Sequence, residues 1–125
     1  MDDSLPALPA PFPPETVERV AAERGRAAPS LADAVRGVQA VAERYVGVDG
    51  LVYEWRSTFP TDPLVARTET AYVLRVDPDV WADFGEHAGL GEDALAGVRA
   101  VHAAVAEGYD ADAAGEPLVL ARPSA

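Results

Sequence analysis

The two histidines, His87 and His102, carry the most versatile side-chain chemistry in this sequence. Together with nearby carboxylates such as Asp83 and Glu86, two imidazoles could bind a metal ion. The histidines lack the i, i+4 spacing that would place both on one face of a helix. We therefore assign no metal ligand and favour ordinary structural histidines, of which His102, beside Val101 on the inner face of a predicted helix, is the one expected to be buried.

Nucleophilic and cofactor chemistry have no local motif in the chain. There is no cysteine, which excludes disulfides, thiolate metal sites and a cysteine nucleophile. No serine is flanked by the glycines of a nucleophile elbow, and no glycine-rich loop follows a predicted strand. We assign no catalytic residue and no cofactor, and we favour a non-enzymatic protein while leaving a small enzyme or ligand-binding protein as an alternative.

Residues 81–100 have the spacing of a helix-turn-helix unit, the motif that many regulators use to read DNA. Such a unit needs basic or amide side chains on its second helix. The matching positions here are Gly91, Glu92, Asp93, Ala96 and Gly97. Acidic residues would repel a phosphate backbone, so the sequence favours a structural helix pair over a DNA reader.

A winged helix is the second route to a DNA-binding regulator, with helices over 14–25 and 30–46 and a hairpin as the wing. Residues 15–46 balance five arginines against five acidic residues. This stretch is neutral, whereas a DNA-binding surface is basic. Nucleic acid is therefore an alternative and not the favoured partner.

The overall charge is strongly negative, with 21 acidic residues against 10 basic ones and a net charge of -11. All the basic residues are arginine, and lysine, asparagine and isoleucine are absent. An acidic excess of this kind is typical of proteins adapted to concentrated salt, because at about 1 M salt the Debye length falls to about 3 Å and repulsion between carboxylates is screened. The alternatives are a surface that grips a basic partner or mimics nucleic acid.

The chain starts Met1-Asp2-Asp3, which is acidic where a secretory signal is basic. No apolar run approaches the ~20 residues of a membrane span. These features predict a cytoplasmic protein that does not enter a membrane.

The chain length suits one domain with one core. Prolines predict an extended tail over residues 1–13, and Pro14 and Ser30 predict the starts of helices over 14–25 and 30–46. Alternation of apolar and polar residues over 51–57 and again over 64–76 predicts two strands joined as an antiparallel hairpin.

Asp77-Pro78 predicts the start of a third helix, which Gly89 ends, and a fourth helix is expected over 92–107. The globular domain is thus placed at 14–108, with an acidic, flexible tail at 109–125. Within that tail, residues 118–121 could be a docked edge strand or a disordered end.

The predicted fold is α+β, with the order α-α-β-β-α-α and a two-stranded antiparallel hairpin packed on two helix pairs. The helices must cover the hairpin because a lone hairpin is marginally stable in water. The side chains assigned to this core are Tyr53, Trp55 and Tyr72 of the hairpin and Val35, Val38, Trp81, Phe84, Leu95 and Val98 of the helices.

Short matches spread over residues 14–107 resemble small acidic uncharacterised proteins of halophilic archaea. The matching residues are Pro29, Ser30, Leu31, Val38, Gln39, Tyr72, Val73, Leu74, Trp81, Gly85, Leu90, Val98, Arg99 and His102. The resemblance implies the same helix pairs and hairpin but no activity, so no functional residue follows from it.

The function that these observations favour is a non-enzymatic protein-interaction or regulatory module. Small domains with an exposed strand edge often bind by contacts with that edge, and we expect the hairpin to present one. The partner's identity and the oligomeric state do not follow from the sequence.

The charge balance makes a first testable prediction. The thermal melting temperature should be higher in about 2 M KCl than in dilute buffer, because salt screens the repulsion among unpaired carboxylates. A melting temperature that is the same in both conditions would contradict the interpretation of the acidity as adaptation to salt.

Overall fold

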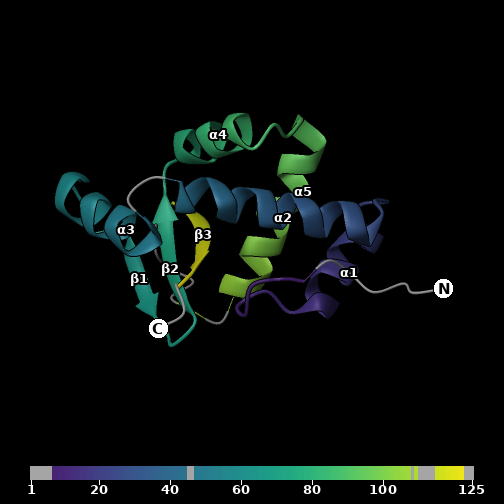
Figure 1. The fold of residues 1–125 in the computed structure, drawn as a ribbon, viewed down its shortest axis with the longest axis horizontal. Helices are drawn as coiled ribbons and strands as arrows, with labels where there is room; N and C mark the ends of the chain where they lie inside the picture. Colours follow the sequence, from purple (N-terminus) through teal and green to yellow (C-terminus); the bar gives the residue numbers. More distant parts are fainter. Residues whose placement is uncertain (1–6, 45–46, 108, 110–114, 123–125) are drawn as a thin grey trace.

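The computed structural model describes residues 7–44, 47–107, 109 and 115–122, and it confirms an α+β fold (Figure 1). Five helices and three strands follow one another in these residues. They are α1 (Pro14–Glu23), α2 (Ala28–Glu43), α3 (Gly47–Thr58), β1 (Leu64–Arg67), β2 (Ala71–Val76), α4 (Pro78–His87), α5 (Glu92–Ala106) and β3 (Glu116–Ala121).

Four of the helices were predicted, and proline or glycine marks most of their ends. Pro14 and Pro78 stand at the first positions of α1 and α4, where their fixed φ favours the helix and no amide proton is needed. Gly89, at φ 72°, follows the end of α4, and Leu90 donates its amide to the carbonyl of Gly85. The predicted start at Ser30 is wrong by two residues, because α2 begins at Ala28 with Pro29 in its first turn.

The predicted strand at 51–57 is wrong, because these residues lie in helix α3. Val48, Leu51 and Val52 are buried at helical spacing, and Trp55 continues the same face. Tyr53, which the strand interpretation placed in the core, is 75% exposed. The segment carries both a period of two and a period near 3.6, and such short apolar runs do not decide between strand and helix.

The hairpin consequently forms elsewhere, inside the segment that was predicted as a single strand over 64–76. The hydroxyl of Thr68 accepts hydrogen bonds from the amides of Thr70 (3.2 Å) and Ala71 (2.9 Å), which closes a turn between β1 and β2. β1 and β2 pair antiparallel with a bulge between Leu64 and Ala66. The order of the sheet is β1-β2-β3, so the two-stranded description is corrected to three strands.

The third strand comes from the segment that the sequence assigned to a flexible tail. Leu118, Val119 and Leu120 are fully buried, and β3 runs antiparallel to β2 with Leu118 opposite Leu74 and Leu120 opposite Tyr72. Residues 116–121 therefore belong to the folded domain, whereas 110–114 and 123–125 of the predicted tail lie outside the described residues.

The predicted N-terminal tail also contributes to the core. Phe12 is only 1% exposed, and its amide donates to the carbonyl of Pro9 at 3.0 Å. The prolines do keep this segment out of a helix, as predicted. Residues 1–6 lie outside the described part.

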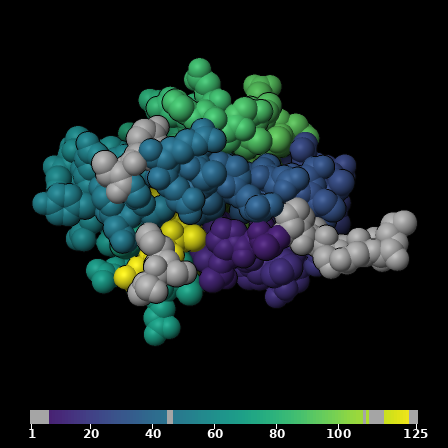
Figure 2. Space-filling model, viewed as in Figure 1, coloured from purple at the N-terminus to yellow at the C-terminus, as the bar shows by residue number. Residues whose placement is uncertain are grey.

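The helices surround the sheet unequally. α2 and α5 contact β3, while α3 lies on the side of β1 (Figure 1). The space-filling view shows α2 spanning one face of the molecule, between α4 and α1 (Figure 2). Among the described residues, no helix combines the length and apolar character needed to cross a bilayer.

Most of the predicted core residues are buried as expected. Tyr72, Val35, Val38, Trp81, Phe84 and Val98 are buried, and Leu95 is partly buried against the core. Trp55 is also only partly buried, a point that matters for the site below.

Trp81 is buried and Tyr53 is exposed, and this difference predicts how truncating each side chain changes the stability of the domain. Trp81 is 1% exposed, so Trp81→Ala should lower the free energy of unfolding by about 3–5 kcal/mol. Tyr53→Ala, the matched control on the surface, should change it by less than about 0.5 kcal/mol. Denaturant melts of both variants measure this, and equal destabilisation would contradict the assigned core.

Candidate functional site

The outer edge of β3 is closed by side chains from three helices. Alternate residues of β3 direct their backbone groups away from β2, and these groups are buried or partly buried, where an unpaired amide or carbonyl is costly. The Nε2 group of Gln39 donates to the carbonyl of Val119, and its Oε1 accepts from the amide of Ala121, both at 2.8 Å. Trp81 donates its indole N–H to the carbonyl of Pro117 at 3.1 Å.

His102 supplies the remaining contact at this edge. Its Nδ1 accepts a hydrogen bond from the amide of Val119 at 2.9 Å, so the proton of the neutral ring lies on Nε2. The ring is fully buried against Phe12 and Trp81, with ring centroids 5.0 and 4.7 Å away. Burial lowers the pKa of His102 to about 3, and the neutral form is the one that can cap β3.

The closed edge of β3 removes one of the two sheet edges to which a partner strand could add, and strand addition at the edge of β1 stays a prediction. β2 is paired on both sides, and β3 is capped by Gln39, His102 and Trp81. The edge of β1 remains, but it has four residues, contains a bulge and follows Pro63. Short, bulged edges of this kind disfavour the addition of a strand.

The two histidines do not form a site together. His102 is fully buried, whereas His87 is exposed on α4 and its Nδ1 lies 2.8 Å from the backbone oxygen of Asp83. No cluster of three metal-ligating side chains occurs in residues 7–44, 47–107, 109 and 115–122. The absence of a metal, a cofactor and a catalytic residue stays a prediction.

The suspected DNA-reading unit corresponds to α4 and α5. Glu92 and Asp93 are exposed in the first turn of α5, and Asp93 forms an ion pair with Arg26. Arg99 pairs with Glu116 of β3 at 3.1 Å. The acidic charge stands where a recognition helix would carry basic residues, and DNA binding through this unit remains untested.

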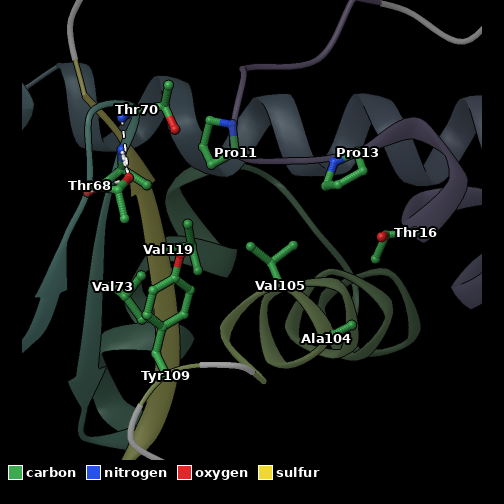
Figure 3. Close-up of a pocket in the computed structure, with 11 residues that line it drawn as sticks. Pro11, Pro13, Thr16, Thr68, Thr70, Val73, Ala104, Val105, Tyr109 and Val119 are labelled. Carbon is green, nitrogen blue, oxygen red and sulfur yellow. Dashed lines mark hydrogen bonds between the residues drawn. The ribbon is translucent and has the colours of Figure 1, made fainter.

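A hollow of about 300 Å³ lies between the N-terminal segment, the hairpin turn and α5 (Figure 3). Its apolar wall is formed by Val73 and Val119 of the sheet and Val105 of α5. Figure 3 shows Tyr109 beside Val73 and Val119, with Pro11 across from it. The lining carries hydroxyl groups but no charged side chain, so it suits a small neutral ligand better than acid-base chemistry.

A larger groove of about 470 Å³ separates α3 from α4, and we name it the α3/α4 groove. Its lining residues are Leu51, Glu54, Trp55, Thr58 and Phe59 on the α3 side and Val80, Asp83 and Phe84 on α4. The Trp55 ring stacks on Phe59 with centroids 5.7 Å apart and lies 6.0 Å from Phe84. Three aromatic rings therefore form one apolar surface that is only partly covered.

The carboxylates at the groove have no cation beside them. Within the described residues, neither Glu54 nor Asp83 forms an ion pair. The arginine next along α3, Arg56, is held by both oxygens of Asp62, at 2.9–3.1 Å. This hydrogen-bonded pairing raises the pKa of Arg56 and lowers the pKa of Asp62, so Arg56 is not available to the groove.

Sequence reasoning found parts of this site and missed others. Trp55 and Phe84 were both assigned to the core, and this is confirmed for Phe84, whereas Trp55 is only partly buried. Gln39 was missed as an edge-capping residue, and the available signal was an amide on the apolar stripe of α2. The burial of His102 was predicted and is confirmed.

The buried His102 makes the stability of the protein depend on pH. Its pKa in the folded state lies below its ordinary value, so the unfolded chain takes up a proton first as the pH falls below about 6.5. The free energy of unfolding contributed by His102 should be complete above that pH and fall by on the order of 3 kcal/mol by about pH 4.

Chemical melts across this pH range test the effect. His102→Phe should be less stable near neutral pH, because the amide of Val119 loses its acceptor, but its stability should fall less on acidification. His87→Phe, at the exposed histidine, should keep the wild-type slope. An unchanged slope in His102→Phe would show that His102 does not titrate as described.

Comparison with known proteins shows the family of the chain and no activity. No curated protein and no solved structure gives a significant match. A family model covers residues 10–122, which is most of the chain and extends beyond the predicted resemblance at both ends. An origin in halophilic archaea stays a prediction. The chain belongs to the family described as a domain of unknown function, DUF8048.

Proposed function

We propose that the protein is a non-enzymatic interaction module that binds a partner protein in the α3/α4 groove. The observation that carries this proposal is the partly covered aromatic surface of Trp55 and Phe59. Large aromatic rings bury much area and dominate interface energetics. A partner that covers such a surface stabilises the complex by about 25 cal/mol per Å² of apolar area that it buries.

The structure of the sheet supports docking on helices in preference to docking on a strand edge. β2 and β3 present no free edge, as described above, and the β1 edge is short and bulged. A segment that lies between α3 and α4 needs no backbone pairing and uses side-chain contacts alone.

A second candidate function is the binding of a small neutral ligand in the hollow of Figure 3. The hydroxyl groups of Thr16, Thr70 and Tyr109 around an apolar wall favour it. The hydroxyl of Thr68 is already engaged in the hairpin turn, which reduces the polar groups available to a ligand. This hollow is also smaller than the α3/α4 groove.

We also propose that the protein works in a cytoplasm of high ionic strength. Four described carboxylates are paired with arginine, namely Asp33, Asp62, Asp93 and Glu116. The net charge of -11 is therefore carried mostly by solvated carboxylates, whose mutual repulsion salt reduces.

Site-specific photocrosslinking in the native host tests the interaction proposal. A benzophenone amino acid at Thr58, in the groove, should capture a defined partner, whereas the same group at the exposed Glu18 of α1 should not. Phe59→Ala should abolish capture from Thr58, because it removes one ring of the aromatic surface, while leaving the domain folded.

Two results would contradict the proposal. The first is the same set of crosslinked proteins from both positions. The second is capture from Thr58 that persists in a folded Phe59→Ala protein, because binding would then not involve the groove.

A further inference from the structure

The α3/α4 groove combines an apolar floor with two carboxylates on opposite walls. Glu54 projects from α3 and Asp83 from α4, and both side chains are exposed to solvent. We infer that the docked partner segment places an arginine side chain between Glu54 and Asp83, over the Trp55 ring, with apolar side chains on either side. This inference rests on the function proposed above and names the chemistry of the partner.

Loss of water from the groove favours a partner that brings a positive charge. Any segment that covers the aromatic floor also removes water from the two carboxylates at its rim. Removing water from a carboxylate without giving it a partner costs more free energy than the apolar contacts contribute. No described residue supplies the missing cation, since Arg56 is paired with Asp62 and the ring of His87 contacts the backbone of Asp83. The compensating positive charge must come from the partner.

A guanidinium group suits this groove better than an ammonium group. Its planar surface can lie on the indole of Trp55 while its N–H groups reach two acceptors at once. Glu54 of α3 and Asp83 of α4 line the same groove as Trp55, and their carboxylates are the acceptors that a guanidinium group could reach. A lysine ammonium is more strongly hydrated and lacks the planar face.

The charge of the groove also argues against other occupants. A second copy of the chain carries the same net charge of -11, which disfavours self-association in dilute buffer, where this charge is not screened. Nucleic acid would bring phosphates against two unpaired carboxylates. A wholly neutral apolar segment would cover the rings but leave Glu54 and Asp83 desolvated and unpaired.

The experiment uses a pair of helix-forming peptides that carry leucines around one central residue. That residue is arginine in one peptide and citrulline, its neutral analogue of nearly the same shape, in the other. Binding to the full-length protein is measured by calorimetry and by nitrogen-proton NMR at one fixed ionic strength. The chain has two tryptophans, so the two indole signals are assigned with Trp55→Phe.

The arginine peptide should shift the Trp55 indole signal and bind about tenfold more tightly than the citrulline peptide. Glu54→Gln with Asp83→Asn should remove that preference. Glu18→Gln with Glu23→Gln, on the exposed face of α1, changes the net charge equally and should keep it.

The contradicting outcomes separate the two proposals. If both peptides shift the Trp55 signal with equal affinity, or if the preference survives in Glu54→Gln with Asp83→Asn, the arginine inference is wrong and the docking groove stands. If neither peptide shifts the Trp55 signal at about 1 mM, both the inference and the docking function are wrong. Self-association that occupies the groove, seen by sedimentation, would replace the proposed partner with a second copy.

Discussion

The hydrogen bonds along the outer edge of β3 are the constraint on which the arrangement of the domain depends. The middle of this strand lies in the core and its ends are partly buried, so its outward amides and carbonyls have little access to water and are paired within the protein. Gln39, Trp81 and His102 provide the pairing from α2, α4 and α5 respectively. The same contacts that satisfy the strand therefore tie three helices to the sheet.

Because the outer edge of β3 is covered, the apolar surface that a partner could reach lies on the helices and not at this edge of the sheet. α3 lies on the side of β1, buries Val48, Leu51 and Val52 in the core, and is joined to the sheet by a hydrogen bond from Tyr72 to Asp49. Burial together with the Asp49 carboxylate raises the pKa of Tyr72, so the phenol stays protonated and can donate this bond. One face of α3 packs in the core. Trp55 and Phe59 lie at the margin of that face and form part of the wall of the groove.

Sequence reasoning succeeded where local chemistry decides the structure. Pro14, Pro78 and Gly89 mark helix ends whatever surrounds them, and the bounds of α1 and α4 were predicted for this reason. It failed for α3, whose short apolar run fits two periods. It left residues 118–121 open between an edge strand and a disordered end, because the assignment of β3 depends on partners far away in the chain. Gln39 and Val119 are one such pair, and no local pattern links them. The groove could not be predicted either, because it requires α3 to be a helix.

Adaptation to salt would account for most of the carboxylates of the chain, but Glu54 and Asp83 have a further proposed role in binding. A carboxylate on an open helix face is solvated and replaceable, and salt screens it as it screens its neighbours. Glu54 and Asp83 differ because they border the aromatic rings, where a docked partner would exclude both water and salt. Salt would screen the two carboxylates less in such a place, so under the proposed docking they would favour a partner that carries a positive charge. The proposed adaptation to salt and the proposed specificity of the groove would thus arise from the same kind of residue in different surroundings.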